Sequence, residues 1–493
     1  GRISLTNCGP NEGDSWKDLL EYRIGLYVQD AFTIQNRLTM NLGVRYDYYN
    51  GWGGKAKTTG YPTGLAFAIG QTLEPTLGFN PFGPFEVPPI KDVMKFGVIQ
   101  PRIGVTYDLF GTGKTAVKFA VSRYAEAMPV MWFSAVSPAV MAQYNFCWWD
   151  LNNNGQPDMP GVDKYAPVPG TVFSRPDVEY LKSTVDPKKK SPTYWEIIAS
   201  INHELLPNFA VQVQYIFRRA YNYHGSARYD KATGRFWYKL EQAPEWWVPF
   251  RTIVPAIGNY PQKEITVYFP TNNSPWASPF YLQTNLPDSK RVYNALELVF
   301  NKRYTHGWAL GGSVVFSRLM YFGGGGYTPN EYTNGYGRAS EDRPVVIKLY
   351  GTVELPYKFI ASFFFTESSG APYARSVSVV PPADWCAKNN VFQTSMSVLL
   401  EPNGSRRTPG FIPDLDLRLE KEFPLPFGRI SFFVDIYNAL GQRSFSFGYN
   451  PGGTWRPTAE GVATGTYTAS YDYGRLTSMS GVRTYKVSFR YSF

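Results

Sequence analysis

The chain ends on GVRTYKVSFRYSF, Gly481 to Phe493, a stretch in which two kinds of side chain alternate. Over its last nine residues, large apolar side chains occupy every second position: Tyr485, Val487, Phe489, Tyr491 and Phe493. Polar side chains lie between them: Lys486, Ser488, Arg490 and Ser492. A period of two places the two sets on opposite faces of an extended strand. Because chain ends usually fray, a final strand that ends on an aromatic residue predicts an end held by hydrogen bonds from neighbouring strands.

The same alternation recurs along the chain, as in Leu38 to Tyr48 and Ile430 to Tyr437. We count about thirteen such segments, at roughly 20–33, 37–49, 99–109, 113–125, 192–204, 208–221, 291–304, 307–319, 343–355, 358–369, 413–423, 428–440 and 482–493. Most are far longer than the average strand of a soluble protein, which has about 5–6 residues. At about 3.3 Å per residue and a steep tilt, strands of this length can cross the apolar core of a bilayer.

The connections between these segments alternate between short and long. Tight turns are expected at TIQNR, FGTGK, LLPNF, YTHGW, LPYK and FPLPFG. Long connections are expected at about 50–98, 126–191, 222–290, 320–342, 370–412 and 441–481. Short turns at one rim and long loops at the other are typical of an outer-membrane β-barrel. The sequence therefore predicts an all-β fold, a transmembrane antiparallel barrel with long extracellular loops and short periplasmic turns.

A barrel satisfies every backbone hydrogen bond within lipid only if it closes, so the final strand is expected to pair with the first. An odd count conflicts with the even strand number of bacterial barrels. Either one strand is missed, with RSFSFGYN and TSMSVLL as candidates, or strands upstream of Gly1 are absent. Because the last strand ends at the short-turn rim, the alternation favours the second alternative. Residues 1–19 are then the end of an extracellular loop or a truncated N-terminus, and 20–493 a barrel portion.

Composition agrees with many strands joined by turns and argues against several functions. Aromatic residues make up 17% and charged residues 18% of 493 residues, with 45 Gly and 39 Pro. The net charge is +10, but Lys and Arg are scattered, which favours lumen-facing charge and attraction to anionic lipid over nucleic acid. The apolar runs are too short for a transmembrane helix. No Ser/His/Asp or paired-carboxylate constellation is evident, so we expect no enzyme.

The cysteines and histidines are few and far apart. Cys8, Cys147 and Cys386 form no Cys-x-x-Cys pair, and their pairing stays open, although the extracellular side permits disulfides. The three His are too dispersed for a histidine metal site.

The most specific local motif is WWDLNNNGQPDMPGVD, in the long connection 126–191. Its oxygen-bearing residues match the spacing of a calcium loop: Asp150, Asn152, Asn154, Gln156, Asp158 and Asp163. Position 12 is Gly161 instead of the usual Glu, so Asp163 would have to substitute. We expect a structural Ca²⁺ in loop 150–163; the alternative is an Asn/Asp/Gly turn without an ion.

Other motifs favour structural explanations. FGTGKT, Phe110 to Thr115, lacks the first glycine of a phosphate loop and leads into no helix, so a hairpin turn is expected. FGGGG, Phe322 to Gly326, is expected to be a flexible loop. Aromatic clusters in the long loops are candidates for ligand contact, although packing of loops on one another is the favoured explanation: Trp148, Trp149, Trp246, Trp247 and Trp276. Inward charges that could line a solute path or bond to neighbouring strands are Asp416, Arg418, Glu420 and Arg490.

Several segments resemble the C-terminal barrel of TonB-dependent transporters, in particular the Oar-like type of Gram-negative bacteria. The similar segments are GLYVQDAFTIQNRLTMNLGVRYDYY, YNALELVFNKRYTHGWALGGSVVFSRLM, EDRPVVIKLYGTVELPYKF, ESSGAPYA, DLDLRLEKEFPLPFGRISFFVDIYNAL and VSFRYSF. The terminal strand, with Tyr491 and Phe493, also resembles the signal read by the barrel-assembly machinery. The long loops show no resemblance.

The resemblance implies a barrel of about twenty-two strands with an N-terminal plug, of which the plug, the TonB-binding segment and the early strands are not in this sequence. It implies an outer-membrane receptor that imports a scarce solute, such as a siderophore, oligosaccharide or peptide, by TonB-coupled transport. Its implied partners are the TonB complex, the assembly machinery, lipopolysaccharide and the solute. Two other functions stay open: a passive porin or fatty-acid channel of about fourteen strands, and an adhesion or scaffold barrel in a larger assembly.

Overall fold

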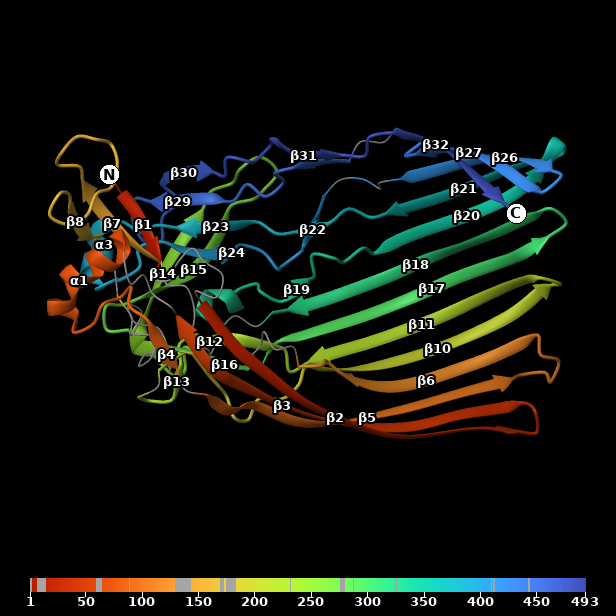
Figure 1. Ribbon diagram of the computed structural model, residues 1–493, viewed down its shortest axis with the longest axis horizontal. Coiled ribbons are helices and arrows are strands. Elements are labelled where there is room, and N and C mark those ends of the chain that lie inside the picture. Colours follow the sequence, from red (N-terminus) through yellow and green to blue (C-terminus); the bar gives the residue numbers. More distant parts are fainter. Residues whose placement is uncertain are drawn as a thin grey trace.

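The computed structural model describes residues 2–6, 15–58, 64–87, 89–128, 143–168, 173, 183–230, 232–274, 280–286, 288–323, 326–408, 410, 413–441 and 444–493. One large antiparallel sheet dominates these residues, and thirteen strands follow one another through it as a meander (Figure 1). In order they are β2 (Ser15–Ile34), β3 (Leu38–Thr58), β5 (Ile90–Asp108), β6 (Thr115–Ala125), β10 (Thr193–Leu206), β11 (Phe209–Tyr221), β17 (Lys290–Thr305), β18 (Trp308–Phe322), β20 (Val345–Leu355), β21 (Phe359–Ser368), β26 (Asp414–Leu425), β27 (Gly428–Tyr437) and β32 (Thr484–Ser492). Each of the thirteen segments predicted from alternation is one of these strands.

The two sequences considered as missed strands lie outside this sheet. RSFSFGYN contributes β28 (Ser444–Phe447), which pairs with β31 (Leu476–Ser480). TSMSVLL contributes β24 (Met396–Leu399), which pairs with β23 (Ser376–Val379). Two short strands join the large sheet at its side, β4 (Phe85–Val87) on β3 and β19 (Gly337–Arg338) on β18. The strand count predicted from alternation is therefore confirmed for the residues that the structure describes.

The short connections are tight hairpin turns because they contain residues that tolerate positive φ. Gln35 and Asn36 both have φ 50°, and His306 and Gly307 have φ 55° and 78°. Two successive positive φ values match the right-handed twist of the strands they join. FGTGKT is also a hairpin, in which the Asp108 carboxylate accepts the backbone N–H groups of Gly111 at 3.1 Å and Gly113 at 2.7 Å. The prediction of a turn in place of a phosphate loop is confirmed.

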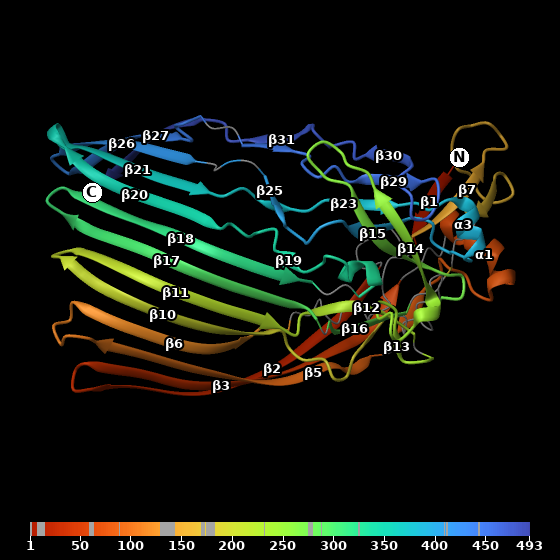
Figure 2. The same cartoon turned by 180° about the vertical axis from the view of Figure 1, so that it is seen from behind.

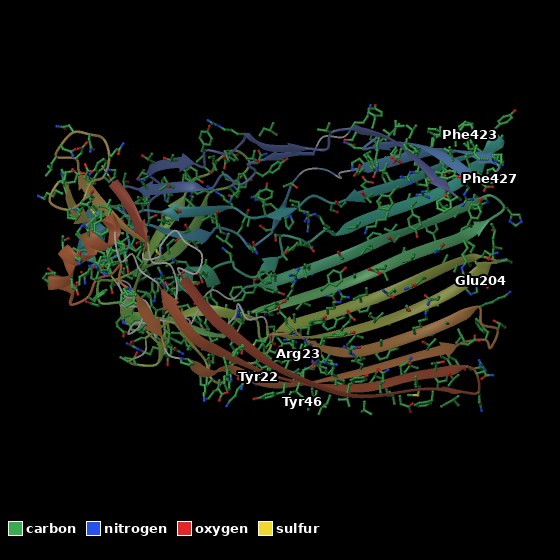
Figure 3. The ribbon with its side chains drawn as sticks, in the orientation of Figure 1. Tyr22, Arg23, Tyr46, Glu204, Phe423 and Phe427 are labelled. Carbon is green, nitrogen blue, oxygen red and sulfur yellow. The ribbon has the colours of Figure 1, made fainter. Side chains whose placement is uncertain are left out.

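The two faces of the sheet differ as the alternation predicts. On β2 the apolar side chains of Ile24, Leu26 and Val28 are all exposed on one face. The opposite face carries polar and charged groups, and Asp47 of β3 is only 2% exposed there. Figure 3 labels Tyr22 and Arg23, neighbours in β2 that project to opposite faces. We call the apolar face the outer face and the polar face the lumen wall.

The predicted pairing of the last strand with the first is not found among the described residues. β2 pairs with β3, and β32 pairs with β27. These strands form the two edges of an open, curved sheet and lie at opposite sides of Figure 1. The Phe493 side chain is fully exposed, at 102%. The prediction that the final strand is hydrogen-bonded on both sides is wrong for this chain on its own, because thirteen strands leave the edges apart.

The long connections fold into small sheets and short helices that gather at one end of the molecule, opposite the hairpin turns (Figure 2). The strands of these sheets are β1 (Arg2–Thr6), β7 (Gln143–Trp149), β8 (Lys164–Pro167), β9 (Ser183–Val185), β12 (His224–Asp230), β13 (Arg235–Phe236), β14 (Trp247–Val254), β15 (Lys263–Pro270), β16 (Phe280–Asn285), β22 (Pro372–Tyr373), β25 (Arg406–Arg407), β29 (Gly453–Pro457) and β30 (Gly465–Ala469), beside β23, β24, β28 and β31. The α-helices are α1 (Leu65–Leu77) and α3 (Ala383–Lys388), and the 3-10 helices are η2 (Pro244–Trp246), η4 (Pro329–Tyr332) and η5 (Pro356–Lys358), the last in a hairpin turn. We call the structure formed by the long connections the cap.

The cap has a hydrophobic core of its own, built from three connections that are far apart in sequence. Its buried members are Trp237, Ala243, Trp246, Trp247, Phe250, Val254, Ile265, Val267, Phe269, Val377, Val379, Met396, Val398, Leu400 and Trp455. Removal of this apolar surface from water is the main force that can hold the three connections together. No helix within the described part of the chain has the length and apolar character needed to cross a membrane.

Candidate functional site

The candidate site residues lie in two regions, the lumen wall and the cap. On the wall, Asp47 lies at the centre of a charged network between β3 and β5. Arg45 donates to its two carboxylate oxygens at 2.8 and 2.7 Å, and Gln100 donates to it at 2.6 Å. The Gln100 side-chain oxygen accepts the backbone N–H of Ala125 at 3.0 Å. The polar groups of this network bond to one another. The network therefore fixes the positions of the strands and leaves few hydrogen-bonding groups for a ligand.

Beside this network the lumen wall has a cavity of about 550 Å³, which we call cavity A. Its lining includes Arg23, Tyr27, Arg45 and Arg102. The guanidinium of Arg23 lies over the Tyr49 ring at 5.2 Å, and that of Arg102 lies over the Tyr124 ring at 5.0 Å. Within the described part of the chain, no carboxylate forms an ion pair with Arg23 or Arg102. Cavity A is therefore electropositive.

A second cavity in the wall, cavity B, has a volume of about 430 Å³. Tyr194, Arg218, Arg291 and Tyr293 are among the residues that line it. Arg218 pairs with Glu196 on the adjacent strand, and Arg291 lies 3.8 Å from Glu341.

A pair of stacked tyrosines lies between the two cavities in the order of the strands. Tyr124 of β6 and Tyr194 of β10 are directly opposite in the sheet register. Their ring centroids are 5.0 Å apart and their planes differ by 23°. Since Arg102 lies over Tyr124 and Tyr194 lines cavity B, cationic and aromatic groups follow one another along the lumen wall from β2 to β17.

The inward charges predicted from the sequence lie at the other end of the sheet. Arg418 donates to both carboxylate oxygens of Asp435, at 2.5 and 3.0 Å, and Asp416 accepts the backbone N–H of Asn438 at 2.9 Å. The guanidinium groups of Arg418 and Arg490 both lie 5.1 Å from the Phe433 ring. These contacts show bonding between neighbouring strands, one of the two alternatives given for this set. Glu420 shares their face by alternation.

The cap contains a larger cavity of about 670 Å³, lined by Tyr321, Gly326, Tyr327 and Glu331 among others. Burial raises the pKa of the Glu331 carboxyl group, which accepts the Tyr327 backbone N–H at 3.3 Å. Gly326 belongs to FGGGG, of which Gly324 and Gly325 are outside the described residues. A Cβ atom on Gly326 would lie 2.5 Å from the Ser226 carbonyl oxygen, so this glycine allows close packing of backbone on backbone.

Loop 150–163 is closed by hydrogen bonds among the residues predicted to bind calcium. Asp163 is buried and accepts the Trp148 indole N–H at 2.8 Å and the backbone N–H groups of Asp158 and Leu151 at 2.9 and 3.1 Å. The Asp158 carboxylate accepts the side-chain amides of Asn152 at 2.8 Å and Asn154 at 2.6 Å.

Asp150 and Gln156 complete the loop. Asp150 accepts the backbone N–H groups of Asn154 and Gly155, at 3.2 and 2.8 Å, and Gln156 donates its backbone N–H to Asn154 at 2.7 Å. Within the residues described, no three His, Cys, Asp or Glu side chains converge on a metal-binding position. The side-chain oxygens of this loop are the kind of ligand that calcium prefers. In this structure they accept hydrogen bonds from N–H groups of the same loop instead.

The aromatic candidates for ligand contact fall into three groups. Trp246 and Trp247 are buried in the cap core, so their function is packing, because a buried indole cannot meet a solute. Trp148 is half-buried and bonded to Asp163. Trp149 is exposed, with the Lys164 ammonium 5.5 Å from its ring. Trp276 lies outside the described residues.

The remaining predicted residues are the cysteines and the terminal aromatics. Cys147 is half-buried and Cys386 buried, and both are free thiols in the structure, while Cys8 lies outside the described residues. Tyr491 donates its hydroxyl to the Phe427 carbonyl oxygen at 2.6 Å, and its ring lies 5.9 Å from that of Phe493.

The sequence prediction did not include the arginines of cavities A and B. Their alternate positions on β2, β3, β5, β11 and β17 carry the same signal that identified Arg418 and Arg490. What the sequence lacks is the register, which decides which arginines share a cavity and which have a carboxylate opposite.

Comparison with known proteins finds a family model described as "Outer membrane beta barrel domain", which matches residues 5–371. No curated protein sequence matches the chain. Solved structures similar to it include the ferric-catecholate import receptor Fiu from K12 E. coli, at TM-score 0.47 and 10% identity over 96% of this chain and 45% of that one. The ferric yersiniabactin uptake receptor FyuA from Yersinia pestis has TM-score 0.46 and 10% identity over 97% of this chain and 47% of that one. P. aeruginosa FpvA has TM-score 0.45 and 11% identity over 97% of this chain and 39% of that one. The chain thus spans less than half the length of each of these structures.

Proposed function

Because the chain belongs to the outer membrane β-barrel domain family, we propose that it forms part of the wall and the cap of an outer-membrane receptor that imports a scarce solute by TonB-coupled transport. The matched family describes a membrane barrel of the Gram-negative outer membrane and not an enzyme. The observation that carries the proposal is the combination of a polar lumen wall, with two cavities, and a folded cap on the long-loop side. A receptor needs both a path for the solute and an extracellular surface that selects it.

The Oar-like subtype and the TonB complex as partner are parts of this proposal and rest on the sequence resemblance. The open edges of the sheet support a further part. Backbone N–H and C=O groups facing lipid need partners, so we infer that strands outside this sheet pair with β2 and β32. The meander of thirteen strands is then a portion of a larger barrel, with Tyr491 and Phe493 at the strand that the assembly machinery would read.

Uptake by whole cells tests the transport proposal. Cells lacking the gene are compared with wild-type cells for growth on a limiting nutrient and for accumulation of the labelled solute. We expect the wild-type advantage to vanish when the proton-motive force is dissipated or TonB is removed. Uptake that persists without energy would favour the passive channel. Normal uptake of every solute by the deletion strain, together with loss of a stable protein partner, would favour the adhesion or scaffold function.

We also propose that loop 150–163 binds a structural Ca²⁺. Within these fourteen residues, three carboxylates and the side-chain amides of Asn152, Asn154 and Gln156 supply the hard oxygen donors that calcium requires. Binding would require Asn152 and Asn154 to turn their amide oxygens, in place of their N–H₂ groups, toward the centre of the loop. The ion would stiffen a loop with little apolar core and would take no part in transport chemistry.

A further inference from the structure

We propose that the lumen wall from β2 to β17 binds an acidic oligosaccharide, a solute in which sugar rings repeat together with carboxylate groups. This inference rests on the transport function proposed above and names the class of solute. It is built from two features of the wall: the arginines without carboxylate partners in cavity A, Arg23 and Arg102, and the tyrosine side chains that line cavities A and B.

The charge of cavity A selects for an anion. Of its three arginines, Arg45 is neutralised by Asp47, whereas Arg23 and Arg102 form no ion pair with any described carboxylate. Both side chains are exposed to the lumen, and each is held in place by an aromatic ring, Tyr49 under Arg23 and Tyr124 under Arg102. A guanidinium group binds a carboxylate through two parallel hydrogen bonds. Two such groups in one cavity can each take one carboxylate of a solute.

The tyrosines add apolar faces of the size of a sugar ring. Tyr27 lines cavity A and is 70% exposed, and Tyr194 lines cavity B. An aromatic ring offers a flat apolar face on which the C–H face of a sugar can pack, with the phenol hydroxyl left free for hydrogen bonds. The stacked pair Tyr124 and Tyr194, with Arg102 over the Tyr124 ring, lies between the groups of cavity A and those of cavity B.

The order of these groups favours a repeating solute over a single small anion. Arg102, Tyr124 and Tyr194 follow one another across three strands, and Arg218 lines the same cavity as Tyr194. Arg218 pairs with Glu196, so the wall offers the unpaired guanidinium groups of cavity A followed by aromatic rings, and these match a ligand in which carboxylates and sugar rings follow one another. A neutral oligosaccharide could use the tyrosines but would leave Arg23 and Arg102 without partners, which is costly for groups that it desolvates.

Calorimetry on the detergent-purified protein tests this inference, with trigalacturonate as the acidic probe and maltotriose as the neutral one. The test variant is Arg23→Gln combined with Arg102→Gln, which removes both charges and keeps side chains of similar shape. The matched control is Arg219→Gln, because Arg219 follows Arg218 on β11 but projects to the outer face. We expect the wild type to bind trigalacturonate, the double variant to bind it at least about tenfold more weakly, and the control to bind as the wild type does. Added salt should weaken binding of the acidic probe.

Three outcomes would overturn the inference: no binding of trigalacturonate to the wild type, equal binding by the double variant, or equally tight binding of maltotriose. The alternative is that Arg23 and Arg102 form ion pairs with acidic side chains of the protein inside the barrel. In that event the double variant melts at a lower temperature while its affinity for the probe is unchanged, which also rejects the inference. Whole-cell uptake separates the two proposals, since energy-independent uptake rejects coupled transport without affecting the affinity measured by calorimetry.

Discussion

At the scale of single residues, Arg375 shows how the cap is held together. It is 2% exposed, and its guanidinium donates to the Pro261 carbonyl oxygen at 2.8 Å and to the Pro255 carbonyl oxygen at 2.7 Å. The same group lies 5.8 Å from the centre of the Tyr260 ring and 5.7 Å from that of the Tyr467 ring. One side chain thus joins three long connections that meet in the cap.

Substitution of Arg375 by Ala should therefore destabilise the cap. It would remove the donor from the part-buried hydrogen bonds to Pro255 and Pro261 and leave a space beside the Tyr260 and Tyr467 rings, and we expect a loss of about 1–3 kcal/mol. Tryptophan fluorescence during thermal unfolding in detergent measures this loss, since several tryptophans lie in the cap core. Arg456→Ala, at an exposed position of β29, is the control and should change stability by less than about 0.5 kcal/mol. Equal effects of the two variants would contradict the structural role of Arg375.

A second residue-scale prediction concerns pH. The Lys189 ammonium nitrogen lies 3.1 Å from Nδ1 of His224 at the base of the cap. Burial, together with the nearby Lys189 charge, lowers the pKa of His224 from 6.5 to about 4. Between these two values the unfolded chain binds a proton that the folded chain does not. The cap should therefore lose stability as pH falls from 6.5 to about 4, by up to about 1.4 kcal/mol per pH unit.

His224→Gln should flatten this dependence, because the side chain at 224 then binds no proton in either state. Melting temperatures at pH 4, 5 and 6.5 provide the measurement. His306→Asn is the control, at an exposed position in a hairpin turn whose φ of 55° asparagine tolerates. If the wild type and His224→Gln lose stability equally on acidification, the proton that destabilises the cap binds elsewhere.

At the scale of elements, the strands of the large sheet could be predicted because lipid on one side and lumen on the other impose a strict period of two. Leu38 to Tyr48 shows that period in sequence and forms β3 in the structure. The small sheets of the cap could not be predicted, because they are short and their pairing joins distant segments, as Val379 of β23 with Trp455 of β29. Trp246 and Trp247 are packed between loops, the explanation that the sequence favoured, but their partners, some more than a hundred residues away, could not be predicted for the same reason. The arginine pairings of cavity A likewise depend on register.

The calcium loop is the element whose prediction is most open to direct test. Titration with terbium, which takes calcium sites and can be excited through Trp148 and Trp149 nearby, should give sensitised luminescence that Ca²⁺ abolishes. The affinity should lie in the range of extracellular calcium modules, about 10⁻⁴–10⁻³ M. Chelation should increase proteolytic cleavage within 150–163.

Asp158→Asn should weaken terbium binding, because it removes the charge toward which Asn152 and Asn154 converge. Asp163 is a poor choice for this test, since its loss would leave three N–H donors without an acceptor whether or not an ion binds. Asp472→Asn, an exposed carboxylate elsewhere in the cap, is the control. Luminescence that is absent, or unchanged in Asp158→Asn, would leave the loop as a hydrogen-bonded turn without an ion.

At the scale of the whole molecule, the assignment of the two faces determines everything proposed for the lumen. Leu298 and Val299 are neighbours near the middle of β17 and project to opposite faces. Leu298 lies opposite Val213 and Val314 on the outer face, whereas Val299 lies opposite Gln212 and Ser313 on the lumen wall. If the outer face meets lipid, the same charged residue should be costly at one position and tolerated at the other.

We therefore expect Leu298→Arg to cost about 2–4 kcal/mol near the bilayer midplane, and Val299→Arg to cost much less, because its guanidinium enters a polar lumen. The amount of folded protein in the outer membrane, measured by its altered electrophoretic mobility before and after heating, reports the difference. Both variants add the same side chain to the same strand, so the change in strand propensity and any effect on expression are the same for the two. A larger loss for Val299→Arg than for Leu298→Arg would mean that the polar face is the one packed against apolar surroundings. Cavities A and B would then lie in contact with lipid, and no solute could reach Arg23 or Arg102 through them.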